Sequence, residues 1–156
     1  MELYQRYGPA VRRKCERILG NTEDAEDVMH SLFIDLIKKQ KTDVDLPYLF
    51  RAATNRCLNL LRNRKKRSLL LARYNRVENG VSNSDEPFDR LSQKQLLQRL
   101  ASGFDQKCAE VFVYYYLDDM TQEEISEFMQ LSRKSIGKKL NKIRNSARKL
   151  EVEGSR

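Results

Sequence analysis

The sequence has no tryptophan, and among its 156 residues it has one histidine, three cysteines and three prolines. His30 is the single histidine, and Cys15, Cys57 and Cys108 lie far apart without a CxxC pair, so the ligand spacing of a zinc site is missing. Three separated cysteines are typical of a reducing compartment, where cysteine serves as a small core residue. We therefore expect no metal site, no cofactor and no catalytic cysteine–histidine pair.

Long apolar runs are also missing. No stretch approaches the roughly 20 residues that a membrane span needs, and the first residues have no positive-then-apolar signal pattern. We therefore expect a soluble, cytoplasmic protein without membrane insertion. Positive charge is in excess, because 30 lysines and arginines stand against 22 acidic residues and give a net charge of +8. This charge indicates an acidic polymer as partner, without saying which one.

Two amphipathic helices are predicted at the start of the chain, over residues 2–19 and 22–39. The second has the most regular helical periodicity of the sequence, and its expected core positions are Ala25, Val28, Met29, Leu32, Phe33, Leu36 and Ile37. Thr22 is expected to cap this helix, and acidic residues fill its first turns, where the helix dipole favours them. The dipole alone explains many such helix starts. Alternatively, the acidic residues form a docking surface for a protein partner.

A third helix is predicted from Pro47 to about Arg67. Its apolar stripe consists of Leu46, Leu49, Ala53, Cys57 and Leu60. A second side carries Arg51, Asn55, Asn59 and Arg62, spaced i, i+4, i+8 and i+11, and a cluster of cations follows at Arg64, Lys65, Lys66 and Arg67. The asparagines and arginines therefore share one side of the helix, away from the expected core.

The segment 75–90 changes character, because glycine, serine, asparagine, proline and acidic residues dominate it. Such a composition is typical of a flexible linker. The halves on either side of it are near the lower size limit for independent hydrophobic cores. The sequence therefore favours two small domains joined by a linker.

A helix-turn-helix is predicted near the end of the chain. Thr121 and Glu124 form a capping box, Gln130-Leu131 makes a tight turn, and Ser132 caps a second helix. Eight cations and no acidic residue lie between Ser132 and Leu150, so DNA phosphates are the simplest source of counter-charge. The aromatic run at residues 114–116 could stack on bases, but its apolar neighbours favour a core position.

In this order, the segments resemble bacterial sigma factors of the extracytoplasmic-function group. Residues 3–39 and 46–67 resemble the promoter-melting domain, and residues 96–150 resemble the C-terminal promoter-reading domain. The resemblance implies an all-α fold with two small helical domains. They are an N-terminal region 2-like domain at 1–68 and a region 4-like helix-turn-helix domain at 91–150, with a flexible linker at 69–90 and a tail at 151–156.

The resemblance also implies a role for each surface. The second helix would dock on the clamp helices of the largest subunit of core RNA polymerase, with candidate contacts Asp24, Glu26, Asp27, Leu32 and Phe33. The third helix would bind and open the −10 element through Arg51, Asn55, Asn59, Arg62, Arg64, Lys65, Lys66 and Arg67. The last helix would enter the −35 major groove with Arg133, Lys134, Ser135, Lys138, Lys139 and Lys142. The polymerase flap, promoter DNA and an anti-sigma factor are the other implied partners.

The function implied is that of an alternative sigma factor for promoter-specific transcription initiation. Such a protein has no catalytic residues, because the core polymerase performs the synthesis. One alternative is a stand-alone helix-turn-helix regulator that dimerises and binds a palindrome. Another is a metal-dependent nuclease using the acidic residues at 23–27, which neighbouring positions on a helix disfavour because their side chains point in different directions.

Overall fold

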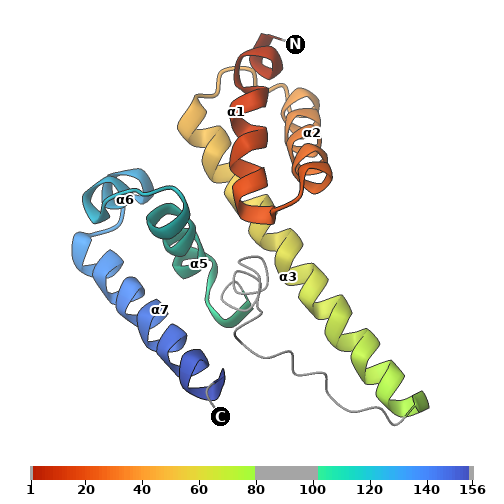
Figure 1. Cartoon of the computed structure of the whole chain (residues 1–156). Coiled ribbons are helices and arrows are strands. Elements are labelled where there is room, and N and C mark those ends of the chain that lie inside the picture. Colours follow the sequence, from red (N-terminus) through yellow and green to blue (C-terminus); the bar gives the residue numbers. More distant parts are fainter. Residues whose placement is uncertain (1, 80–101, 155–156) are drawn as a thin grey trace.

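The computed structural model describes residues 2–79 and 102–154, with side chains described at 2–73 and 102–149. All the elements assigned in these ranges are helical, so the predicted all-α fold is confirmed (Figure 1). In chain order they are α1 (Glu2–Leu19), α2 (Thr22–Lys38), α3 (Leu46–Asn79), α5 (Gln106–Phe112), the π-helical turn η2 (Val113–Leu117), α6 (Gln122–Met129) and α7 (Arg133–Gly154). None of the described helices is long and apolar enough to cross a membrane.

A sharp turn joins α1 to α2. Gly20 adopts a positive φ of 68°, which costs glycine little and reverses the chain. Asn21 then caps α2, because its Oδ1 accepts a hydrogen bond from the Asp24 backbone N–H at 3.1 Å. The predicted cap, Thr22, is wrong by one position. The residue after the left-handed glycine takes the extended conformation that a cap needs, and Thr22 is already helical.

Helices α1, α2 and the first half of α3 pack against one another. The predicted stripe of α2 is buried except at its end, where Ile37 is 65% exposed. On α3, Leu49, Ala53 and Cys57 are buried as predicted, but the predicted Leu60 is only half-buried. Leu58 and Leu61, which were not predicted to be core residues, are buried as well. The reason is that α3 contacts α1, α2 and also α5, so its buried surface is wider than a single stripe.

Helix α3 is longer than predicted. It continues beyond Arg67 to Asn79, so its last turns occupy the first part of the segment that we assigned to a linker at 69–90. No glycine or proline interrupts the chain between Ser68 and Asn79, and Gly80 is the first residue that would favour an end to the helix. The rest of the predicted linker lies outside the described residues.

The C-terminal helices add buried side chains to a hydrophobic cluster that they share with α1, α2 and α3. These side chains are Phe104, Cys108, Ala109, Val111, Val113, Tyr114, Ile125, Met129, Ile136, Leu140 and Ile143. The predicted caps are present, because the Thr121 hydroxyl accepts a hydrogen bond from the Glu124 backbone N–H and the Ser132 hydroxyl accepts one from Ser135, each at 3.1 Å. Gln130 makes the turn between α6 and α7 with a φ of 55°. The predicted helix-turn-helix is therefore formed.

Candidate nucleic-acid and protein interfaces

Helix α7 presents a cationic surface beside the short helix α6. Its apolar residues at 136, 140 and 143 are buried, which holds the helix to the domain. Of its six predicted DNA-facing residues, Arg133, Lys134, Lys138 and Lys142 are exposed, while Ser135 and Lys139 are half-buried. Within the described range of α7, no cation forms an ion pair with an acidic side chain. The helix therefore offers positive charge to an external partner.

The outer side of α2 combines acidic and apolar residues. Glu23, Asp27 and His30 are exposed, and Ile34 and Ile37 follow on the same side with exposures of 50% and 65%. Leu32 and Phe33, by contrast, are only 2% and 4% exposed. The expectation that Leu32 and Phe33 contact a partner is therefore corrected, since they are core residues that position α2.

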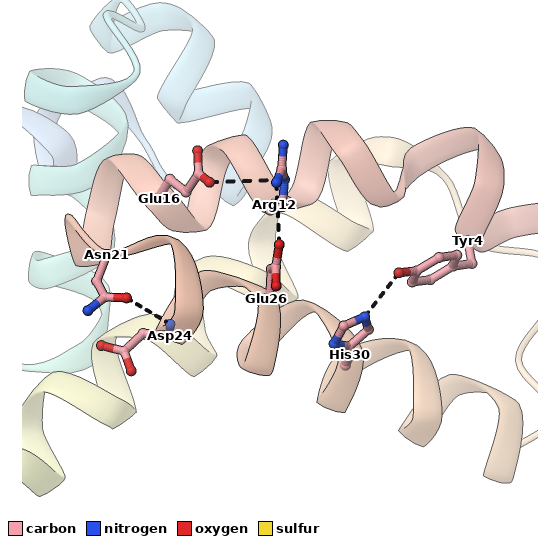
Figure 2. A network of polar contacts seen from close by, with 7 residues as sticks. All are labelled: Tyr4, Arg12, Glu16, Asn21, Asp24, Glu26 and His30. Carbon is pink, nitrogen blue, oxygen red and sulfur yellow. Dashed lines mark hydrogen bonds and ion pairs between the residues drawn. The ribbon is translucent and has the colours of Figure 1, made fainter.

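The acidic start of α2 is tied to its neighbours. Glu26 is paired with Arg12 of α1 at 3.4 Å, and the Tyr4 hydroxyl is hydrogen-bonded to His30 Nε2 at 3.0 Å. Figure 2 shows both contacts between α1 and α2. Asp24 accepts two hydrogen bonds from Arg64 of α3, at 2.6 and 2.7 Å. Of the predicted acidic contacts, Asp27 is therefore the one that is fully on the surface, whereas Asp24 and Glu26 also brace the helix packing.

The predicted DNA-facing side of α3 is covered by the start of α5. Gln106 donates a hydrogen bond from Nε2 to Asn55 Oδ1 at 2.8 Å. Arg62 donates to the Gln106 side chain and, at 3.2 Å, to the Phe104 carbonyl oxygen. Lys65 donates to the Ser102 hydroxyl at 2.6 Å. Asn55 and Arg62, which the spacing placed on one side of α3, therefore do lie together, but in this structure they contact the start of α5.

Asn59 and the last cations of the cluster lie elsewhere. Asn59 is exposed and lines a cavity of about 350 Å³ between α2 and α3, together with Asp27, Asn63 and Arg64. Lys66 and Arg67 are exposed on the next turn. The eight residues predicted to bind the −10 element therefore form two adjoining surfaces, one of them accessible and the other covered.

Glu110 is an acidic residue of α5 that the sequence did not single out. It is 2% exposed, and its Oε2 has no hydrogen-bond partner in the described part of the chain. Burial raises the pKa of this carboxyl, against the opposing attraction of Arg51 and hydrogen bonds from Gln106 and Asn55. A charged carboxylate at this position is therefore a cost to the packing of α5 on α3.

We expect Glu110→Gln to raise the midpoint of thermal unfolding at pH 7 by about 2–4 °C, because the amide carries no charge to desolvate. The gain is fully present above the raised pKa of Glu110. It disappears as the pH falls below the ordinary carboxyl range, where the wild-type side chain is protonated in both the folded and the unfolded state. Thermal melts at several pH values test this, with exposed Glu127→Gln as control. A midpoint lowered at pH 7 would contradict it.

Comparisons with known proteins match both parts of the chain. The family model for Sigma-70 region 2 matches residues 3–67, and that for Sigma-70 region 4 matches residues 94–146. The ECF RNA polymerase sigma factor SigW of Bacillus subtilis (strain 168) is 25% identical over 162 residues, which cover 92% of this chain and 83% of SigW. The sigma factor RpoE, solved in complex with the anti-sigma factor NepR from Bartonella quintana, matches with a TM-score of 0.50 and 17% identity, over 97% of both chains. At that identity the likeness to RpoE concerns the fold.

Proposed function

The chain belongs to the extracytoplasmic-function group of sigma-70 factors, and from this premise we propose how its surfaces divide the work of transcription initiation. As a sigma factor, it binds core RNA polymerase and promoter DNA and directs initiation without an enzymatic activity of its own. We assign polymerase docking and −10 opening to α2 and α3, and −35 recognition to α7. The single observation that carries this division is that three chemically different surfaces lie on three different helices.

The outer side of α2 docks on the clamp helices of the polymerase. Asp27 supplies charge there, while the exposed Ile34 and Ile37 supply apolar area. A patch of exposed apolar side chains rimmed by charge is typical of a protein interface. Asp24 and Glu26 reinforce the acidic field from their paired positions, and Leu32 and Phe33 hold α2 in place from the core.

Helix α3 captures the melted strand of the −10 element. Arg51, Asn55, Asn59 and Arg62 offer hydrogen-bonding groups to bases that have lost their pairs, and the cations at 64–67 hold the adjoining phosphates. Asparagine suits this role because its amide both donates and accepts, as the exposed edge of an unpaired base does.

Helix α7 reads the −35 element from the major groove. Arg133, Lys134, Ser135 and Lys138 lie on its first two turns, the part of a recognition helix that contacts base edges. The half-buried Lys139 and the exposed Lys142 flank them and anchor phosphates. This assignment is supported by the absence, in the described part of α7, of any acidic residue that pairs with its cations.

Promoter opening provides the test of the assignment of α3. We expect Asn55→Ala to reduce opening about tenfold, because a bidentate amide contact to a base contributes roughly 1–3 kcal/mol, while binding to core polymerase stays unchanged. Permanganate reactivity of unpaired thymines measures opening, and native gel shifts measure association with the core enzyme. The control is Asn63→Ala, which changes an exposed asparagine on the same helix. Equal losses of opening and association would mean that Asn55 is structural.

We also propose an anti-sigma factor as a partner and the cytoplasm as the site of action. The first is supported by the fold-level match to RpoE, which was solved with the anti-sigma factor NepR. The C-terminal domain would contact the polymerase flap in the initiation complex. Affinity capture of the tagged chain from its own host, followed by identification of bound proteins, separates polymerase from a dedicated inhibitor.

A further inference from the structure

Helix α7 contains a glycine in its interior. Gly137 is the fifth residue of α7 (blue in Figure 1) and lies between the buried Ile136 and the exposed Lys138. Glycine is the poorest helix former after proline, because it loses more backbone freedom than any other residue when a helix forms. A glycine at this place therefore lowers the stability of α7, unless a contact depends on the side chain that it lacks.

Packing inside the protein does not require this glycine. A Cβ atom at Gly137 would meet no heavy atom of the described residues within 4 Å, apart from its chain neighbours and the backbone of its own helix. Gly8 of α1 is different, because a Cβ atom there would lie 3.7 Å from Met29 Sδ of α2. The missing side chain of Gly137 therefore leaves an open space, called the gap below, and does not make room for a neighbouring helix.

The gap lies among the residues that we assign to DNA. Positions three and four residues apart share one side of a helix. Arg133 and Lys134 lie one turn before Gly137, Asn141 lies one turn after it, and all three of these side chains are exposed. The gap therefore opens on the cationic surface of α7, with longer polar side chains before and after it.

The chemistry of the gap is apolar. Within a helix the backbone N–H and C=O groups bond one another, so the surface at Gly137 offers C–H groups to a partner and no free donor or acceptor. Among the groups on the major-groove edges of base pairs, the C5-methyl group of thymine is the apolar one. A methyl group also matches in size the first side-chain atom that glycine lacks. The gap is therefore complementary to a thymine.

We propose that Gly137 is a specificity-determining residue, whose gap receives the methyl group of one thymine in the −35 element. This inference rests on the proposed role of α7 in −35 recognition. Contact with the gap removes the methyl group from water, which favours thymine over the other bases at that position. A side chain at residue 137 would hold the helix backbone away from the base, whereas glycine permits the close approach.

Moving a methyl group from the DNA to the protein tests the proposal. On a promoter recovered by run-off transcription from genomic fragments, each thymine of the −35 element is replaced singly by deoxyuridine, which pairs identically but lacks the methyl group. We expect the wild-type holoenzyme to lose about fourfold in affinity at the thymine that fills the gap, as for one buried methyl group. Gly137→Ala should lose about tenfold on the unmodified promoter, because its new methyl group overlaps that of the thymine. Deoxyuridine at the same position should restore most of that loss.

Thermal unfolding distinguishes this role from a structural one. We expect Gly137→Ala to raise the midpoint by about 2–4 °C, because alanine is the better helix former and the space is open. The matched control is Gly103→Ala, since Gly103 is exposed, lies outside α7 and has the same open space around a Cβ atom. This control should bind every promoter as the wild type does. A lowered midpoint in Gly137→Ala would overturn the proposal, because the fold itself would then require the glycine.

The binding results separate the gap from the function on which it rests. A more stable Gly137→Ala that binds the unmodified promoter weakly, and is rescued by deoxyuridine at one position, supports the proposal. Wild-type affinity in this variant, or a loss that deoxyuridine at no single position relieves, overturns it. The assignment of −35 recognition to α7 then still stands or falls with the replacement of Lys134 and Lys138 by glutamate, which does not depend on a thymine methyl group.

Discussion

Replacing Lys134 and Lys138 together with glutamate is expected to reduce −35 binding by at least about 100-fold and to flatten its dependence on salt. Both lysines are exposed on the first two turns of α7, and neither is in an ion pair. Each phosphate contact contributes about 0.9 to the slope of log affinity against log salt concentration, so two lost contacts lower the slope by about 1.8. The introduced carboxylates add repulsion from the phosphates.

Holoenzyme binding at several salt concentrations measures this effect, on a promoter recovered by run-off transcription from genomic fragments. The matched control is Lys38→Glu with Lys39→Glu, an identical change of charge at two exposed positions at the end of α2. That control lowers affinity only through the overall field, and its slope should remain near that of the wild type. A wild-type slope in the α7 variant would instead mean that Lys134 and Lys138 face solvent in the complex.

The helices and the surface of α7 could be predicted because their signals are local. Thr121 and Ser132 cap α6 and α7 as predicted, and the cap of α2 was predicted within one residue, because these hydrogen bonds depend only on neighbours in the sequence. The run of cations in α7 was equally readable, because an unbroken series of like charges needs no knowledge of the fold. The family resemblance then connected these parts into one function.

The predictions of burial were wrong where the packing of one helix on another determines which side chains are buried. Ile37 continues the apolar period of α2 but has no neighbouring helix over it, and Leu61 of α3 is buried because α3 meets more than one partner. The pairing of Lys14 with Asp118 joins residues 104 positions apart. No periodicity within one helix predicts such a contact. Leu32 and Phe33 were predicted both as core residues of α2 and as polymerase contacts. The structure shows that they lie on the buried side of the helix, opposite the side that a partner can reach.

Two exposed isoleucines on the outer side of α2 are expected to contact the polymerase. The sequence pattern had placed Ile37 in the core and had left Ile34 out of it, but both are exposed. We expect Ile34→Glu with Ile37→Glu to weaken binding of the core polymerase by about 30-fold or more, because the few central hot-spot side chains of an interface contribute about 2 kcal/mol or more and the new carboxylates would be buried on binding. The thermal unfolding midpoint should change little, because both side chains are at least half exposed. Competition against a labelled sigma factor for core enzyme measures the affinity.

Leu69→Glu with Leu70→Glu is the matched control, since it replaces two other exposed apolar residues, on α3, with the same charges. If surface hydrophobicity alone governed association, both double variants would lose affinity equally, and the assignment to α2 would fail. A selective loss in the α2 variant, with folding intact, would instead identify the side of α2 that carries Asp27 as the docking surface. Leu32 and Phe33 then act beneath it, because truncating them would lower stability first and polymerase affinity only as a consequence.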